Sequence, residues 1–583
     1  MAGFILASTA ALDPTRLARL DRTQQDAGFQ KQFDSTAHGW RLLVYAPLQT
    51  APACVHQRAD GAVLACAGHL IYRGQSGEAA LAAMLADQDR DAVETEDLFG
   101  HYALLRGDAA GWRLDGDALG GFKIYHDAGG TIYSNMFLSV FEAMPNPRVD
   151  VQGFYEYLWQ GVVNGPGSFI ADLRSVPPQR RLFFNEQGVR EQVLPSPNWL
   201  APDLSACGMD ELVMHCGRQF MRAMGALAAQ FGDRLNTALS GGFDSRLILA
   251  ALLAHQVRPR LFSYGRQRDQ DRRVAVRTAK ALGLELKAID KSQVPRLSVE
   301  AYERHMARNL VVFDGWKPTG IFDNGSDLED RLQRLQGVGA IINGSGGECL
   351  RNFFYLPDRP YALDDLISTF YATYAPAACT SEWDEQSYRA ALIAQMRHDL
   401  GATTDGPLPR HLIELAYPLF RVRYWSSRDM AVNQRFGWAY YPFLQPQIFA
   451  GTATIPLRFK THGRLEARMI RALSPRLAAQ ASDYGFSFDQ PVPWSYRAKM
   501  LLTYLRPPSL RRYAYRIRYA LPRRRPYYLK ADYLNRFIDP AMPHVRQWVR
   551  PDKLHDEDAF NRAATVEYLL TWHRARRMVN PTP

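Results

Sequence analysis

Residues 235–254 of this sequence, LNTALSGGFDSRLILAALLA, decide how the rest is interpreted. A short apolar run typical of a buried strand stops at Ser240-Gly241-Gly242, and an apolar helical pattern begins at Asp244-Ser245. The glycines leave consecutive backbone N–H groups open to close approach, and such groups bind anions. The positive end of the helix dipole points at the same place. We therefore expect this turn to bind phosphate.

The side chains of the turn indicate which kind of phosphate-containing ligand it binds. The hydroxyls of Ser240 and Ser245 can donate to phosphate oxygens. Asp244 would repel bare phosphate, so we expect it to hold Mg²⁺ that bridges phosphates. No lysine follows the glycines, as it would in a GxxxxGK[ST] loop. The turn predicts a cradle for pyrophosphate rather than a site of γ-phosphoryl transfer; the alternative is a tight turn with capping residues.

The segments after this turn alternate between strand and helix patterns. Residues 260–264 (RLFSY), 284–289 (LELKAI) and the start of 338–348 (VGAIINGSGGE) are typical of strands, and the helical run DRRVAVRTAKAL ends at Gly283. Alternating strands and helices predict a parallel α/β sheet, which binds ligands at the carboxyl ends of its strands. Beyond about residue 360 the patterns are largely helical.

The first 195 or so residues differ, because short β-rich runs are broken there by Gly, Asp and Asn turns. Helical patterns at 76–86 and 151–160 interrupt these runs, and PSPNWLAPDLS at 195–205 is typical of a linker. We expect two domains, residues 1–200 and residues 205–583.

The string SGGFDS resembles the PP-loop of the asparagine synthetase family, whose members adenylate a carboxylate and release pyrophosphate. Further segments resemble the family's second strand, second glycine loop, C-terminal helical block and glutamine-amidotransferase domain. RPRLFSYGRQRDQDRRVAVRTAKALGLELKAI resembles the second strand, INGSGGE the second glycine loop, and residues 426–473 the helical block. Two segments resemble the amidotransferase domain, LFGHYALLRGDAAGWRLDGDALGGFKIYH and LRSVPPQRRLFF. The resemblance extends from residue 1 to about 490.

This resemblance implies a fold and a set of ligands. The N-terminal part would be an Ntn-hydrolase-like αββα domain of the class II glutamine amidotransferase type. The C-terminal part would be a PP-loop domain, a parallel α/β sheet with a large helical extension. ATP would lie on the PP-loop with its adenine near Phe262 and Ser263. The second loop would contribute Gly344, Gly346 and Gly347, and Glu348 would join Asp244 as a ligand of Mg²⁺.

The chain departs from the family where glutamine is hydrolysed. That reaction needs an N-terminal cysteine as nucleophile, and position 2 is Ala2. The family's Asn-Gly-Glu site for glutamine becomes Ala67-Gly68-His69. We infer a glutaminase-like shell without glutaminase activity.

The half that selects the amine is altered as well. Ser345 stands where asparagine synthetases carry an acid tied to amine attack, and the family's P-F-L-D becomes P-F-L-Q, ending at Gln445. The family's lysine that stabilises the acyl-adenylate chemistry aligns with Asp483. Another cation must then act, and Lys460 and Arg464 are the candidates.

Among relatives of this family, lasso-peptide cyclases are most similar, since they too lack the glutaminase cysteine. They activate an Asp or Glu side chain of a peptide, and the peptide's own N-terminal amine attacks to close a macrolactam. The expected partners are a precursor peptide, a leader-peptide-removing protease and a peptide-recognition protein. Two alternatives stay open: an amide ligase that uses free ammonia on a small acid or glycan precursor, and a catalytically silent ATP-binding scaffold.

Composition bounds these hypotheses. The 583 residues are 47% hydrophobic and 22% charged, which is ordinary for a soluble protein with two or more cores. No apolar run approaches the roughly 20 residues of a membrane span. The N-terminus has no basic region before its apolar run, and the six cysteines form no CxxC pair. We expect a cytoplasmic protein without a zinc site or a disulfide framework.

The net charge of +11 is uneven, since residues 504–530 (YLRPPSLRRYAYRIRYALPRRRPYYLK) concentrate Arg and Tyr. Arginine pairs with anions and stacks on aromatic rings, so this segment could bind nucleic acid or an acidic peptide. Prolines interrupt the run and no nucleic-acid motif accompanies it, so we expect no nucleic-acid partner. An Arg-rich surface helix and loop is the simpler interpretation.

Overall fold

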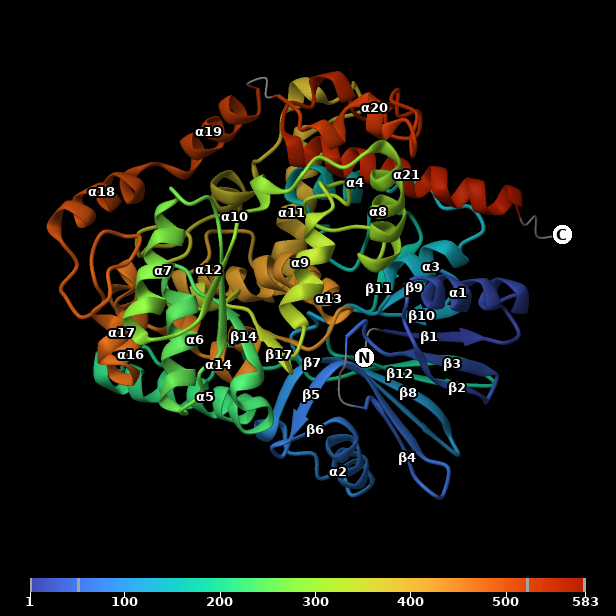
Figure 1. Cartoon of the computed structure of the whole chain (residues 1–583), viewed down its shortest axis with the longest axis horizontal. Helices are drawn as coiled ribbons and strands as arrows, with labels where there is room; N and C mark the ends of the chain where they lie inside the picture. Colours follow the sequence, from blue (N-terminus) through green and yellow to red (C-terminus); the bar gives the residue numbers. More distant parts are fainter. Residues whose placement is uncertain (1–2, 50–52, 521–523, 580–583) are drawn as a thin grey trace.

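The structure, a computed structural model, describes residues 3–49, 53–520 and 524–579 (Figure 1). The strands in this part of the chain form two antiparallel sheets and one parallel sheet. The protein is therefore a mixed α/β protein that contains a parallel sheet, as the sequence predicts. None of the described helices combines the length and apolar composition that crossing a membrane requires.

The two antiparallel sheets lie in the N-terminal third of the chain. The first contains β1 (Gly3–Ser8), β2 (Lys31–Ala37), β3 (Trp40–Tyr45), β9 (Tyr125–Asp127), β10 (Ile132–Ser134) and β11 (Leu173–Ser175). The second contains β4 (Val55–Gln57), β5 (Val63–Tyr72), β6 (Gln75–Ser76), β7 (Leu98–Asp108), β8 (Gly111–Gly116), β12 (Arg180–Asn185) and β13 (Gly188–Val193). Their orders are β11-β9-β10-β1-β3-β2 and β13-β12-β8-β7-β5-β4, with β6 beside β5.

Strand β5 explains how these layers stack. All of its residues are buried, and successive side chains point to opposite faces. Ala65, Ala67 and Ile71 join the main core, whereas Leu64 and Cys66 pack with helix α2 (Gly77–Asp89). A strand covered on both faces is almost wholly apolar, as AVLACAGHLIY is apart from His69. Helices α1 (Pro14–Asp26) and α3 (Phe137–Ala143) pack beside the first sheet, so the sheets lie between helices.

The parallel sheet contains β14 (Leu235–Ala238), β15 (Arg260–Tyr264), β16 (Leu286–Ile289), β17 (Ala340–Ile342) and β18 (Ala439–Tyr440). Its order is β16-β15-β14-β17-β18, and each neighbouring pair is parallel. Helix α6 (Phe243–Ala254) joins β14 to β15, and helix α7 (Gln270–Leu282) joins β15 to β16. Gly283 ends α7 in the left-handed conformation, with φ of 66°. Because β14 is central, the turn that follows it lies in the middle of the sheet's carboxyl edge.

Helices make up most of the remaining chain. The longer ones are α4 (Val151–Gln160), α5 (Met209–Phe231), α8 (Val299–Val312), α9 (Ser326–Leu335), α11 (Glu385–Leu400), α12 (Arg410–Ala416), α13 (Ser427–Gln434), α16 (Arg464–Leu473), α18 (Trp494–Leu505), α19 (Pro508–Ala520) and α21 (Glu557–Val579). A π-helical segment, Tyr417–Ser426, joins α12 to α13. Short helices are α10 (Leu363–Leu366), α14 (Pro446–Phe449), α15 (Leu457–Lys460), α17 (Pro475–Ala478) and α20 (Ala531–Leu534).

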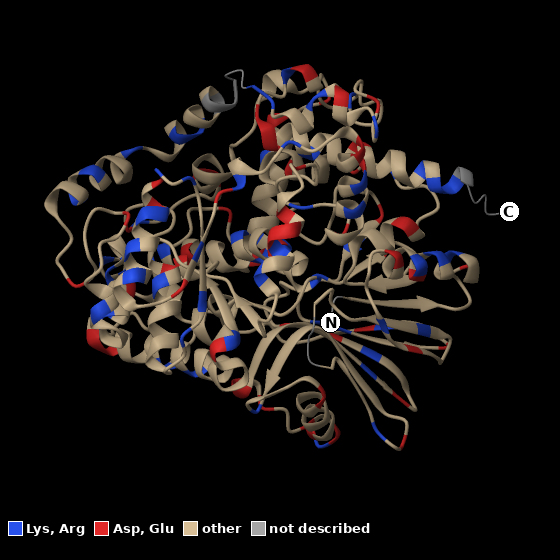
Figure 2. Cartoon of the chain, viewed as in Figure 1, with Lys and Arg blue, Asp and Glu red and all other residues tan. Residues whose placement is uncertain are grey.

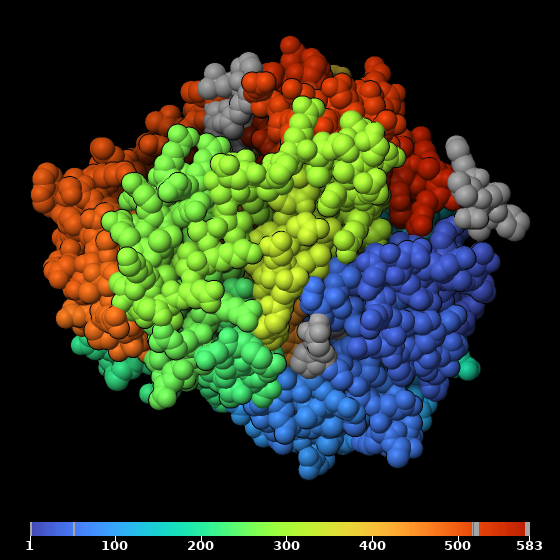
Figure 3. All heavy atoms as spheres, viewed as in Figure 1, coloured from blue at the N-terminus to red at the C-terminus, as the bar shows by residue number. Residues whose placement is uncertain are grey.

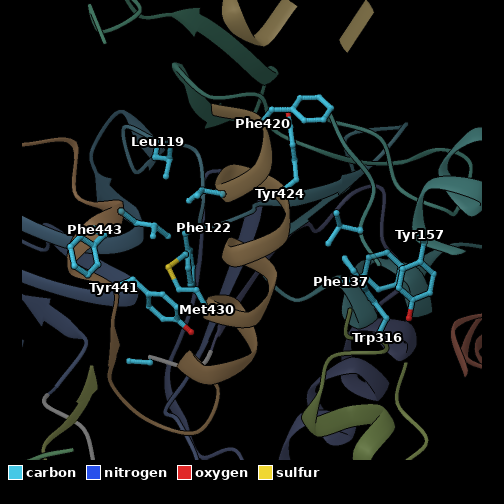
Figure 4. Close-up of a cluster of buried hydrophobic side chains, with 14 of the residues drawn as sticks. Leu119, Phe122, Phe137, Tyr157, Trp316, Phe420, Tyr424, Met430, Tyr441 and Phe443 are labelled. Atoms are coloured by element: carbon cyan, nitrogen blue, oxygen red, sulfur yellow. The ribbon is translucent and has the colours of Figure 1, made fainter. Parts of the chain in front are cut away.

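The antiparallel sheets and the rest of the chain share one core. In Figure 4, Leu119 and Phe122 from the N-terminal part lie beside Tyr424 and Met430 from the C-terminal part. Nearby, the ring of Trp316 lies 5.3 Å from that of Tyr157. The space-filling view shows the N-terminal residues in blue against the later segments in green and yellow (Figure 3). Residues 194–208, which contain the predicted linker, include no helix or strand; the boundary between 200 and 205 stays a prediction.

Candidate functional site: two glycine loops around an acidic cluster

Internal hydrogen bonds fix the turn that follows β14. The backbone N–H of Ser240 donates to Oγ of Ser245 at 3.1 Å, and the two hydroxyl oxygens lie 2.9 Å apart. The N–H of Gly242 donates to Oγ of Ser240, also at 3.1 Å. Ser245 belongs to the first turn of α6, so its hydroxyl ties the loop to the helix N-terminus. The hydroxyls of Ser240 and Ser245 therefore hold the turn in shape, whereas the sequence predicted that they would donate to phosphate oxygens.

The middle of the turn already contacts a carboxylate. The N–H of Gly241 donates to the side chain of Asp271, in the first turn of α7. A Cβ on Gly241 would lie 2.6 Å from Cβ of Asp483 and 2.8 Å from its backbone nitrogen, so only glycine fits. An N–H group that binds a carboxylate oxygen can bind a phosphate oxygen. Asp483, at the position that the sequence resemblance pairs with a lysine, lies directly against the loop.

The second glycine loop reaches the first because β17 neighbours β14 in the sheet. A Cβ on Gly344 would lie 3.2 Å from Cβ of Asp244, and a Cβ on Gly347 would lie 2.0 Å from its Oδ1. Glycine at position 347 is thus required for this approach. Gly346, with φ of 103°, adopts the left-handed conformation that favours glycine. The loop places Glu348 on the same side of the sheet as Asp244.

The guanidinium of Arg351 holds these acids together. Its Nη2 lies 2.7 Å from Oδ2 of Asp244 and 3.5 Å from Oε1 of Glu348, and its Nε lies 3.1 Å from Oε2 of Glu466. The hydroxyl of Tyr417 donates to the other oxygen of Glu348. Sequence reasoning missed Arg351, Glu466 and Tyr417. Only the position of Arg351, three residues beyond Glu348, could have indicated one of them.

Burial and mutual repulsion perturb the charges of this cluster. Burial raises the pKa of Asp244 to about 6, against the attraction of Arg351 and with help from Glu348. Burial also raises the pKa of Glu466 well above its ordinary value. Burial alone would lower the pKa of Arg351, but Asp244, Glu466 and Glu348 outweigh it and raise that pKa. Three carboxyl groups surround one guanidinium, so this cluster would attract a further positive charge.

Magnesium fits this arrangement. Oδ1 of Asp244 and Oε1 of Glu466 are buried and accept no hydrogen bond from an N–H group of the described residues, whereas Oε2 of Glu466 faces Nε of Arg351 at 3.1 Å. Among all the described residues, no three His, Cys, Asp or Glu side chains are arranged so that they could hold a metal ion by themselves. Mg²⁺ is usually bound by one or two carboxylates together with phosphate oxygens and water. Asp244 and Glu348 are the pair that would hold it.

A cavity of about 200 Å³ opens beside the acidic cluster. Glu348, Arg351 and Lys460 supply charge to its wall, and most of the other lining side chains are aromatic. These are Phe243, Phe353, Tyr355, His462, Tyr484, Tyr496 and Tyr504. A charged end and an aromatic wall suit a substrate with a carboxylate on a larger organic body.

The structure separates the two cations proposed from the sequence. Lys460 lines the cavity, and its Nζ donates to the carboxylate of Glu414 and, at 3.3 Å, to the carbonyl of Thr452. Arg464 lies outside the cavity and donates to the carbonyl of Arg458 at 3.2 Å. Ser345 does not line the cavity either, and its N–H donates to Oδ1 of Asn343 at 2.8 Å.

The residues predicted near adenine lie on β15, next to β14. Phe262 and Ser263 are both buried, at 5% and 3% exposure, and Arg334 lies over the Phe262 ring. Oγ of Ser263 has no hydrogen-bond partner among the described residues. An unpaired buried hydroxyl is costly, so it is a candidate contact for a ligand.

The segment Ala67-Gly68-His69, which the sequence resemblance pairs with a glutamine site, packs against the C-terminal part of the chain. His69 on β5 is 1% exposed, its ring nitrogen bonds to the amide of Gln434, and burial holds its pKa well below the ordinary value. The space left around Gly68, His69 and Trp438 is only about 10 Å³. Ala2, at the position where the resemblance expects a catalytic cysteine, lies outside the described residues.

Gln445, the last residue of the altered P-F-L-Q string, also joins the two parts. Its Oε1 accepts from the N–H of Gly100 at 3.0 Å, and its Nε2 lies 2.9 Å from Nε2 of His101. Both partners lie on β7, so Gln445 packs against the N-terminal sheet. Gln445 therefore contributes to the packing between the two parts of the chain and lies away from the cavity that Lys460 lines.

Comparisons with known proteins give little. No family model matches the chain, and no curated protein matches it. Two matching solved structures are the allosteric regulatory enzyme of purine biosynthesis and the glutamine phosphoribosylpyrophosphate amidotransferase from B. subtilis complexed with ADP and GMP. The first is 12% identical with a TM-score of 0.23, covering 49% of this chain and 80% of that chain. The second is 14% identical with a TM-score of 0.22, covering 49% and 65%. Scores this low carry no argument about fold or activity.

Proposed function

We propose that this protein is an ATP-dependent amide ligase that adenylates a side-chain carboxylate of a precursor peptide. The peptide's N-terminal amine then attacks and closes a macrolactam, as in lasso-peptide biosynthesis. The observation that carries the proposal is the meeting of two glycine loops at neighbouring strand ends, which brings Asp244 and Glu348 together beside the SGG turn. ATP and Mg²⁺ would be its cofactors.

The phosphate side of the reaction follows from the loop geometry. The N–H of Gly241, which faces a carboxylate oxygen in this structure, and the N-terminus of α6 would hold the pyrophosphate that leaves as a substrate carboxylate attacks the α-phosphorus. Mg²⁺, held by Asp244 and Glu348, would neutralise charge on the phosphates. Lys460 lines the cavity where the carboxylate must approach, so we assign it the role of positioning and neutralising that group.

The amine side follows from what the N-terminal part lacks. His69, Gln434 and Trp438 crowd the segment that the sequence resemblance pairs with a glutamine site, and the space beside them is about 10 Å³, which supports an amine from another source. In this proposal the amine belongs to the substrate itself, which requires no second nitrogen source. Tethering it can lower the barrier by about 7–11 kcal/mol, because the attack becomes intramolecular.

One observation favours a second candidate. The cavity of about 200 Å³ is small for a pre-folded peptide, but it accommodates a small acid. An asparagine-synthetase-like ligase that joins free ammonia to a small acid or a glycan precursor would use the same phosphate chemistry. Only the source of the amine and the size of the acid would differ.

Release of AMP and pyrophosphate from Mg·ATP separates the candidates. One reaction contains the precursor peptide with its protease and recognition protein, and the other contains aspartate and ammonium. AMP formed only with the peptide, with loss of one water from the peptide's mass, supports macrolactam closure. AMP formed with aspartate and ammonium refutes the cyclase and supports the second candidate. No AMP in either reaction contradicts both.

A further inference from the structure

The net charge of the protein is concentrated in one segment. The chain has 70 Lys and Arg against 59 Asp and Glu, and eleven of the basic residues lie in residues 490–531. This segment contains no Asp or Glu, so the remainder of the chain is electrically balanced. Figure 2 shows Lys and Arg, and no acidic residue, on the two helices that the segment forms, α18 and α19.

These helices run end to end along the outer edge of the molecule (Figure 1). Their inner faces are anchored. Arg511 donates to the carbonyls of Phe354 and Tyr355 at 2.9 and 2.8 Å, and the Tyr515 hydroxyl donates to the carbonyl of Thr369 at 3.0 Å. Tyr496, Met500 and Tyr504, four residues apart on α18, line the cavity described above. The opposite faces are therefore held toward solvent.

The outer faces are unusually apolar for an exposed surface. On α18 Trp494 is 80% exposed and Leu502 is 72% exposed; on α19 Ile517 is 66% exposed. The other large exposed side chains there are Leu501, Leu505, Leu510 and Tyr513. Half of the large hydrophobic side chains exposed in the described residues thus lie on these two helices. Their spacing keeps them on one stripe of each helix. Arg497, Lys499 and Arg506 flank the stripe and are exposed too.

We propose that the outer face of α18 and α19 docks on the surface of an anionic lipid bilayer. A helix with Trp and Leu on one face and Lys and Arg beside them lies in the membrane interface, its apolar side chains among the acyl chains. The basic residues complement anionic headgroups, and no acid in the segment opposes them.

An acidic peptide explains the same features less well. It would satisfy Arg497, Lys499 and Arg506, but it would leave the stripe of Trp and Leu in water. None of the outer-face residues lines the cavity beside these helices, so they form a ridge rather than a groove for a peptide. On a bilayer, the cavity wall formed by Tyr496 and Tyr504 would lie about one helix diameter, roughly 10 Å, from the membrane. This proposal does not depend on the ligase activity.

Flotation of the full-length protein with vesicles tests the proposal. We expect binding to phosphatidylcholine vesicles that contain about 30% phosphatidylglycerol, and weakening of that binding as salt rises. Pure phosphatidylcholine vesicles should bind much less. No binding to the anionic vesicles would overturn the proposal, and so would displacement from them by polyglutamate at equal charge.

Variants show whether this face is responsible. Leu502→Ser with Leu505→Ser should weaken binding at least about tenfold. Arg497→Gln should weaken it about fivefold and reduce its salt dependence. Val193→Ser with Met214→Ser removes side chains that are 64% and 60% exposed elsewhere, and should change nothing. Unchanged binding in the leucine variant, with circular dichroism like the wild type, would refute docking through the apolar stripe.

Discussion

Replacing Arg351 by methionine should expose the repulsion within the acidic cluster. Methionine keeps much of the side-chain volume but removes the positive charge shared by Asp244, Glu348 and Glu466. Removing one partner of a buried ion pair costs about 3–5 kcal/mol, because the remaining charge is left uncompensated. Arg351 serves three carboxylates, of which Glu466 is 0% exposed. We therefore expect the unfolding free energy to fall by an amount in that range.

This loss should depend on pH with a definite sign. The pKa of Asp244 is about 6 in the folded protein, above its unfolded value, and the pKa of Glu466 is raised too. The folded protein thus binds more protons than the unfolded chain, so these groups cost more stability as pH rises. Arg351 opposes both shifts, and its removal raises both values further. The difference between Arg351→Met and wild type should grow from pH 5 to pH 8, a window of about three units.

Magnesium supplies the decisive assay. Thermal unfolding of the variant should shift upward with MgCl₂ and without ATP, since a divalent cation can replace the lost guanidinium. At a hundred times Kd the gain is about 2.7 kcal/mol. Arg423→Met is the matched control, because Arg423 is buried against one acid, Asp399, at 3.3 Å and away from the cavity. It should be destabilised and gain nothing from Mg²⁺. Equal Mg²⁺ responses in the two variants would refute the reasoning.

Three further predictions concern the site and the core. Gly347→Ala should lower AMP release about tenfold to a hundredfold, because its Cβ would lie 2.0 Å from Oδ1 of Asp244 and displace that carboxylate. Lys460→Met should lower kcat for AMP formation about 10²- to 10³-fold, whereas Arg464→Met should stay within about twofold of wild type. Glu156→Gln should stabilise the protein above pH 7 by up to about 3 kcal/mol and have little effect near pH 4, as measured by urea unfolding across pH. Burial raises the pKa of Glu156 to about 7, so the ionised form costs stability as pH rises from the unfolded value through 7.

Each of these predictions has its own control. Gly406→Ala adds a Cβ with no atom within 4 Å, so it should leave AMP release unchanged. Equal losses in Lys460→Met and Arg464→Met would mean that the cavity does not identify the acting cation. A pH-independent effect of Glu156→Gln would mean that folding does not raise the pKa of Glu156 and would contradict the prediction.

Local pattern was sufficient for the elements that build the site. RLFSY is strand β15 at residues Arg260–Tyr264, and the helix after it ends at Gly283, as predicted. The strand has a buried apolar centre and the helix has one buried face, so composition and periodicity specify them. Strand β2, KQFDSTA, was missed because it lies at a sheet edge with no buried residue and thus lacks an apolar pattern.

The partners within the site could not be predicted in the same way. Arg351 and Glu466 are separated by more than a hundred positions, and only folding brings them together. Lys460 and Arg464 are four residues apart and looked equivalent in sequence. The left-handed residue His462, with φ of 62°, breaks the helix between them, so one lines the cavity and the other faces away. Likewise, only the folded structure shows which face of α18 lines the cavity and which face is exposed to solvent.

Transfer of ¹⁸O from a labelled substrate carboxylate tests the central claim most directly. If the carboxylate attacks the α-phosphorus of ATP at the SGG turn, amide formation leaves one labelled oxygen in AMP and none in pyrophosphate. The label should appear in AMP with the wild-type protein and be lost with Asp244→Asn. Label found in inorganic phosphate beside ADP would mean γ-phosphoryl transfer and would contradict the account.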